Sequence, residues 1–247
     1  MSKRSWAPAA AVVLTVLSLG GCGGGGPAGG GAATTQRSPA AATSPNDNGI
    51  ASKPVKEIVA ASRQALLSAR SVQVELDYKD KQGLIRMNLR LTRNKDAAGW
   101  VEQAGTRIHI VATGGKFYIR SPELWRQQAP AEVASMIGDR WVLAPSEVIG
   151  EVTPFSKDLS IAGLADKIFD PASTPTFFRK SRSTADGRPA VRLQTLDGSY
   201  YIAATGKPYP LRVDGTGDHQ DITFSRYDQV PAIRPPRGAL DLEQLGG

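Results

Sequence analysis

Residues 71–92 read SVQVELDYKDKQGLIRMNLRLT, a stretch in which apolar and polar side chains alternate. The first half places Val72, Val74 and Leu76 on one side of an extended chain, and the second half repeats this period after a turn at Gly83. A period of two is typical of antiparallel strands with one buried and one solvated face. The stretch therefore predicts a β-hairpin whose apolar face must be covered by another part of the chain.

The same period recurs on the C-terminal side of this hairpin. Turn signals that contain glycine, such as Gly105, Gly114 and Gly187, separate short apolar runs. They add eight predicted strands to the two of the hairpin, at 99–104, 107–113, 116–120, 176–183, 189–195, 199–204, 209–214 and 221–227. This spacing predicts an antiparallel meander.

Helical patterns precede and interrupt the predicted strands. From Pro54 to Ala69, apolar residues recur three and four positions apart, which is typical of a helix with one buried face. Two more helices are predicted at 129–137 and 160–169, within an insert between the two groups of strands. Their apolar residues need a partner surface, and the open face of the sheet is the expected one. The sequence thus predicts an α+β fold.

The N-terminal segment has the pattern of a lipoprotein signal. Lys3 and Arg4 precede an apolar run that ends at Leu19, and two glycines separate this run from Cys22. The run is too short for a membrane-spanning helix, and its end resembles the bacterial lipobox. We expect 1–21 to be a signal peptide and Cys22 to carry a diacylglyceryl anchor at the extracytoplasmic face of the cell membrane. The alternative is a secreted protein trimmed near Cys22.

Composition limits the partners and the source of stability. The formal net charge is +7, and Lys and Arg are scattered without a run longer than two, which disfavours a nucleic-acid partner and suits an anionic membrane surface. Cys22 is the single cysteine, so an internal disulfide is excluded and stability must come from packing. Residues 22–52 are rich in Gly, Ala, Ser, Thr and Pro and predict a flexible tether.

Residues that could support catalysis are few. The chain has two histidines, His109 and His219, and lacks the common nucleophile, phosphate-loop and zinc-protease motifs. His109 alternates with isoleucines, which predicts that it lies on the polar face of a strand. One turn gathers three aspartates without the pattern of a calcium loop, namely Asp214, Asp218 and Asp221. We therefore expect no catalysis, no metal and no cofactor.

Several stretches resemble the mycobacterial LppX/LprG-type lipoproteins, which share the fold of the lipoprotein carriers LolA and LolB. The stretches are ARSVQV at 69–74, GGKFYI at 114–119, DRWV at 139–142, YYI at 200–202, TGKPYPLRV at 205–213 and FSRY at 224–227. The resemblance implies a strongly curved antiparallel sheet, a half-barrel of about 10 to 11 strands, with helices covering its concave face. It also implies that the cavity holds an acylated lipid or glycolipid, and that the protein takes part in lipid transfer across the envelope.

In this reading residues 53–236 form the lipid-binding domain and 237–247 a C-terminal tail. The apolar residues expected on the concave side come from the predicted strands and the insert: Val72, Val74, Leu76, Ile85, Met87, Leu89, Leu91, Ile108, Ile110, Phe117, Ile119, Trp125, Met136 and Trp141. The same residues would also fill an ordinary packed core. The alternative function is therefore a non-enzymatic envelope scaffold or sensor that binds a protein partner. An unrecognised hydrolase is a weaker third possibility.

The anchor leads to a prediction. Replacing Cys22 with Ala removes the thiolate that accepts the diacylglyceryl group, so the protein should leave the membrane fraction and lose the mass of the lipid. Cell fractionation followed by intact-mass spectrometry measures both effects. A membrane-bound variant of unchanged mass would rule out lipidation.

Overall fold

The computed structural model describes residues 46–80, 83–144, 159–169, 175–215 and 220–241, which belong to one compact unit, Thr43–Gly247. The predicted signal peptide, Cys22 and most of the tether lie outside the described residues. Four α-helices are described, α1 (Val55–Ser68), α2 (Pro122–Gln128), α3 (Ala131–Ile137) and α5 (Ile161–Phe169), and a 3-10 turn, Ile50–Ser52, precedes them.

Twelve described strands form one sheet, in the order β12-β6-β5-β4-β3-β2-β1-β11-β10-β9-β8-β7. All neighbours are antiparallel except the β12–β6 pair. The α+β prediction is confirmed, with twelve strands. Their bounds are β1 (Ser71–Asp80), β2 (Gly83–Thr92), β3 (Ala97–Gln103), β4 (Thr106–Thr113), β5 (Lys116–Arg120), β6 (Val142–Ala144), β7 (Arg179–Ala185), β8 (Arg188–Thr195), β9 (Gly198–Ala203), β10 (Pro210–Gly215), β11 (Gln220–Ser225) and β12 (Leu240–Asp241).

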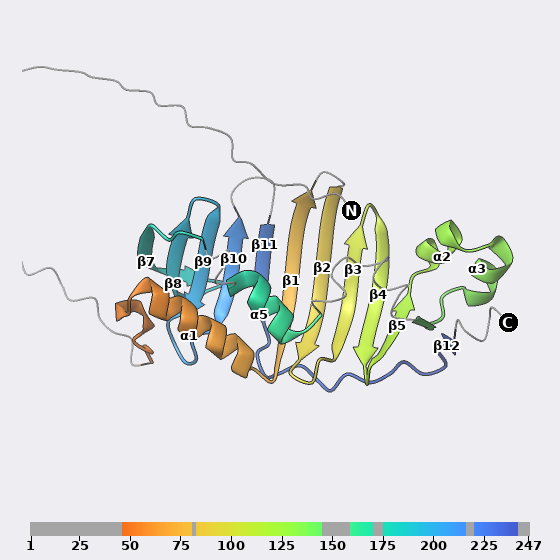
Figure 1. Cartoon of the computed structure of the whole chain (residues 1–247), viewed down its shortest axis with the longest axis horizontal. Helices are drawn as coiled ribbons and strands as arrows, with labels where there is room; N and C mark the ends of the chain where they lie inside the picture. The colour runs from red at the N-terminus through yellow and green to blue at the C-terminus, as the bar shows by residue number, and fades with distance from the viewer. Residues whose placement is uncertain (1–45, 81–82, 145–158, 170–174, 216–219, 242–247) are drawn as a thin grey trace, which may run out of the picture. The chain divides into compact units, whose positions relative to one another are not determined.

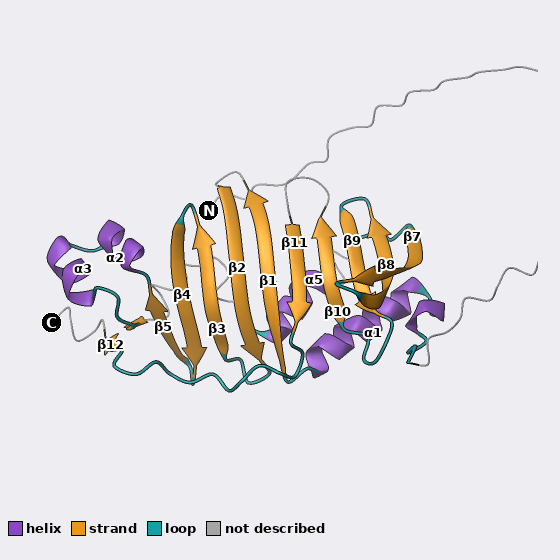
Figure 2. Ribbon diagram, turned by 180° about the vertical axis from the view of Figure 1, so that it is seen from behind, coloured by secondary structure: helices purple, strands orange, loops and turns teal. Residues whose placement is uncertain are grey.

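The helices lie on one side of the sheet. Figure 1 shows α1 and α5 in front of the strands from β7 to β1, with α2 and α3 beside β5. Figure 2 shows the opposite face, over which no described helix lies. The main core cluster fills the space on the helical side and contains Leu66 from α1, Trp125 from α2 and Phe169 from α5. This is the arrangement expected of helices that bury an apolar stripe against an open sheet.

The insert and the C-terminus differ from the sequence prediction. The helix predicted at 129–137 is present as α3, and a further helix that was not predicted, α2, precedes it. Ser121 starts α2 by accepting a hydrogen bond from the Leu124 amide, 3.3 Å away. At the C-terminus, the segment predicted as a tail contributes β12, which pairs with β6 at the edge of the sheet.

The first strand is central because it pairs with both the next strand and the last long one. In β1, Val74 lies opposite Leu89 of β2 and opposite Phe224 of β11. Phe224 is fully buried. The predicted hairpin is the pairing of β1 with β2. The additional pairing of β1 with β11 brings the two ends of the domain together.

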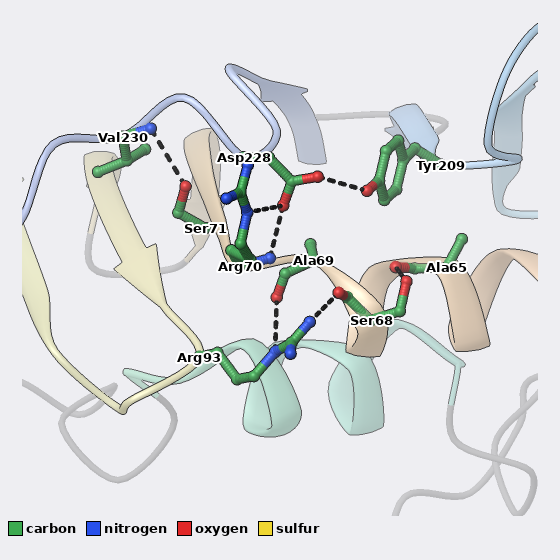
Figure 3. A network of polar contacts seen from close by, with 9 residues as sticks. All are labelled: Ala65, Ser68, Ala69, Arg70, Ser71, Arg93, Tyr209, Asp228 and Val230. Carbon is green, nitrogen blue, oxygen red and sulfur yellow. Dashed lines mark hydrogen bonds and ion pairs between the residues drawn. The ribbon is translucent and has the colours of Figure 1, made fainter.

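Polar contacts fasten the corner where α1 passes into β1 (Figure 3). The Arg70 amide donates to the Asp228 carboxylate at 2.6 Å, and the Tyr209 hydroxyl donates to its other oxygen at 3.1 Å. The Asp228 amide in turn donates to the Ser71 carbonyl at 2.9 Å. From the other side, the Arg93 guanidinium donates to the Ala69 carbonyl at 3.3 Å. The ends of β2 and β11 are thus both tied to this corner.

Asp228 should make stability depend on pH. Burial alone would raise the pKa of its carboxyl, but hydrogen bonds from Arg70 and Tyr209 lower that pKa below the ordinary value of 3.8. A carboxylate with a lowered folded-state pKa stabilises the fold above the unfolded-state pKa, and this contribution is lost as the pH falls through the folded-state pKa.

We therefore expect Asp228→Asn to lower the free energy of unfolding by about 1 to 2 kcal/mol at neutral pH. Asparagine tolerates the positive φ of 61° at this position. The difference in the free energy of unfolding between variant and parent should disappear as the pH falls below about 4. Denaturant unfolding at a series of pH values measures this difference. Asp166→Asn, at an exposed ion pair, is the control and should change little. A difference independent of pH would contradict this role.

Candidate functional site

A cavity of about 410 Å³ lies between the sheet and α5. Its lining comes from five neighbouring strands, from α5 and from Leu159, two residues before the helix. The lining is mostly aliphatic, with two tyrosines and one lysine: Val74, Leu76, Tyr78, Met87, Leu89, Leu91, Leu159, Leu164, Lys167, Ile168, Tyr200, Val213 and Ile222.

The floor of the cavity is a row of residues that face one another across strands. Met87 lies opposite Leu76, which lies opposite Ile222. The row continues through Val213 to Tyr200, so it crosses β2, β1, β11, β10 and β9. Because successive side chains of a strand point to opposite faces, this register puts all five on the helical side of the sheet. The floor is therefore continuous across the junction of β1 and β11.

The roof comes from one face of α5. Leu164, Lys167 and Ile168 are spaced three and four apart, so they lie on the same side of the helix. The helix packs beside α1, where the Arg63 guanidinium contacts the Asp166 carboxylate at 2.5 Å. Both side chains of this ion pair are exposed to solvent, so the pair contributes little to stability. The roof is therefore held mainly by its apolar face.

The electrostatic character of the cavity is close to neutral. Burial raises the pKa of the Tyr200 hydroxyl, and the nearby Asp197 raises it further. Tyr200 is therefore uncharged at physiological pH. Lys167 is the single charged side chain among the residues that line this cavity, and it is exposed. The site offers an apolar space and presents a cation at α5, which suits the chain of an amphiphile better than a polar solute.

The structure separates the residues predicted for the cavity. Five of the fourteen line it: Val74, Leu76, Met87, Leu89 and Leu91. Others are packed in the main core cluster without lining it: Val72, Ile85, Ile108, Ile110, Phe117, Ile119 and Trp125. Met136 lies in α3 with 45% of its surface exposed. Trp141 is half-buried, and the Arg120 guanidinium lies 5.2 Å from its ring centroid.

Eight lining residues were not predicted: Tyr78, Leu159, Leu164, Lys167, Ile168, Tyr200, Val213 and Ile222. Tyr78 continues the alternation of β1 and could have been included on that ground. Leu164 and Ile168 belong to an apolar helical stripe whose partner surface the sequence does not specify. Val213 and Ile222 become part of the floor because β11 pairs with the distant β1, which no local pattern reveals.

The described groups considered for catalysis or metal binding do not line this cavity. His109 pairs with Trp100 on the opposite face of the sheet. Burial lowers the pKa of its imidazole, and Arg120 and Arg107 lower it further. Asp214 contacts the Arg212 guanidinium, while Asp218 and His219 lie outside the described residues. No cluster of three or more potential metal ligands occurs within the described ranges. None of the described helices is long and apolar enough to cross a bilayer.

No protein-family model matches the sequence, and neither does any curated protein. Among solved structures, LprF from Mycobacterium bovis has 16% sequence identity and a TM-score of 0.48, over 74% of this chain and 97% of LprF. LppX from Mycobacterium tuberculosis has 13% identity and a TM-score of 0.48, over 73% of this chain and 100% of LppX. At these identities the likeness concerns the fold alone. In its fold the chain is similar to the mycobacterial lipoproteins LprF and LppX, as the sequence motifs predicted.

Proposed function

We propose that this protein is a non-enzymatic lipoprotein of the cell envelope that binds an acylated lipid or glycolipid by its acyl chain in the cavity beneath α5. The observation that carries the proposal is the cavity itself, about 410 Å³ of space with a mainly aliphatic lining. Ligand pockets commonly exceed about 300 Å³, whereas packed protein cores leave few voids larger than a water molecule.

The energetics favour an acyl chain as the occupant. Each methylene that leaves the bilayer for water costs about 0.8 kcal/mol, so a carrier must offer a surface nearly as apolar as the membrane interior. The row from Met87 to Tyr200 is such a surface, with Leu164 and Ile168 facing it from α5. In this proposal the sheet bends around the chain as the predicted half-barrel, and α5 serves as the cover.

The alternative is a scaffold or sensor whose core is filled by its own side chains. A cavity of this size does not support a filled core. Attachment of the protein to the membrane through Cys22 is a second part of the proposal. Every residue that lines the cavity lies after Asn46, in the described part of the chain. The cavity can therefore be tested in a domain without Cys22, and the anchor can be tested separately.

We expect lipid to co-purify with residues 43–247, the range that forms one compact unit. Native mass spectrometry of this domain, produced in a lipid-containing host, should show adducts of acyl-lipid mass. Met87→Glu places a charge in the cavity floor and should reduce the adducts at least about tenfold, because an unpaired buried carboxylate is costly. Leu84→Glu is the matched control on the same strand, since Leu84 is 37% exposed and does not line the cavity. It should keep the adducts.

A second variant covers the case in which Met87→Glu does not fold. Val213→Phe fills part of the cavity without adding a charge and should also displace the lipid. Circular dichroism checks that each variant is folded. If the parent domain shows only its bare mass, under conditions in which an established carrier keeps its lipid, the cavity proposal fails and the scaffold becomes the better explanation.

A further inference from the structure

An aromatic and basic surface occupies the edge of the sheet formed by β7. Phe178 precedes this strand with 61% of its surface exposed, although it is a large apolar side chain. Exposed lysines and arginines lie along β7 and around the start of α1. Lys180 and Arg182 share one face of β7, and Arg179 points to the other face at the same edge. We call this set the β7 patch: Lys53, Lys56, Phe178, Arg179, Lys180 and Arg182.

Two polar contacts join β7 to the residues before α1. The Lys180 ammonium donates to the Lys53 carbonyl at 2.8 Å, which joins β7 to the turn before α1. The Arg182 guanidinium pairs with the Asp47 carboxylate at 2.8 Å. Residues 47–56 and β7 therefore lie side by side at the edge of the sheet, where Figure 1 shows β7 as the last strand.

The patch has an excess of positive charge. Its five cations face two carboxylates, Asp47, which pairs with Arg182, and Glu57, which lies 3.7 Å from Lys53. A hydrogen bond from Arg182 lowers the pKa of Asp47, so that carboxylate stays ionised at neutral pH. The patch keeps a net charge of about +3, which attracts an anionic surface.

The patch is also next to the cavity. Phe177, the neighbour of Phe178, is half-buried and packs edge-on against Tyr200, with ring centroids 5.4 Å apart. Tyr200 in turn lines the cavity. Phe177 and Tyr200 thus connect the start of the β7 patch to the lining of the cavity.

The start of the domain lies at the same place. Asp47, which contacts Arg182, is the second described residue of the chain, and Asn48 is fixed beside it by hydrogen bonds to the Ala203 and Gly206 carbonyls at 3.0 and 2.9 Å. The described part of the chain therefore begins beside the β7 patch.

We propose that the β7 patch docks on a bilayer that contains anionic phospholipids. Interfacial binding combines an apolar side chain that enters the headgroup region with cations that meet anionic lipids, and Phe178 and its neighbours supply both. An acidic protein segment would need the cations but not the exposed phenyl ring. This proposal rests on the proposed function: docking through the β7 patch would bring the end of the lipid-binding cavity that contains Tyr200 close to the membrane.

Vesicle flotation tests this proposal. Residues 43–247, which lack Cys22, should float with phosphatidylcholine vesicles that contain phosphatidylglycerol and not with phosphatidylcholine alone. Binding should weaken as salt is added, because exposed charges are screened. The double variant Lys56→Gln, Arg179→Gln should bind roughly 10- to 30-fold more weakly. Phe178→Ala should reduce binding several-fold.

Matched controls lie at the other end of the sheet. Lys95→Gln, Lys116→Gln removes two exposed charges, one from the turn before β3 and one from the first position of β5, and should retain most of the binding. Met136→Ala removes a 45% exposed methionine from α3, far from β7 in Figure 1, and should retain it as well. Equal losses in the control and patch variants would overturn the proposal, since attraction would then follow net charge alone.

The absence of binding to the anionic vesicles at low salt would also overturn it, and would leave an acidic protein segment as the occupant of the patch. Native mass spectrometry separates this failure from failure of the cavity. The patch variants should keep their acyl-lipid adducts while losing the vesicles, and the Met87→Glu variant should do the reverse.

Discussion

The pairing of β1 with both β2 and β11 is the constraint on which the rest of the structure depends. Only when β11 reaches β1 does the row from Met87 through Leu76 to Ile222 become continuous. The contact joins residues far apart in sequence, as the 158 positions between Arg70 and Asp228 show. Such pairing has a high cost in chain entropy, and burial of Phe224 and the hydrogen bonds of Asp228 offset part of it. The cavity therefore exists only in the completely assembled sheet.

Much of the fold follows from local patterns. The alternation of Val74, Leu76, Met87 and Leu89 correctly indicates which side of the hairpin is apolar, and the spacing from Val55 onward correctly predicts α1. The four strand residues also line the cavity. These features depend on neighbours in sequence, which is why sequence reasoning reaches them.

The rest depends on position along the sheet, which periodicity does not encode. Ile110 and Trp125 face the helical side as predicted, but they pack at the β4 and α2 end, away from the space beneath α5. Val213 and Ile222 alternate with polar residues as the hairpin residues do, but the pairing of β11 with β1, which no local pattern encodes, places them in the floor. A periodic pattern assigns a residue to a face, and long-range register decides whether that face meets a void or a packed neighbour.

The two edges of the sheet also bear on how the protein behaves at high concentration. Exposed strand edges can recruit the edges of other molecules and so start aggregation. At one edge β6 is covered by the short β12. At the other, Arg179, Lys180 and Arg182 place like charges along β7, so two copies that approach edge to edge repel each other. The charges along β7 and the short β12 therefore both disfavour pairing of copies through the edges of the sheet.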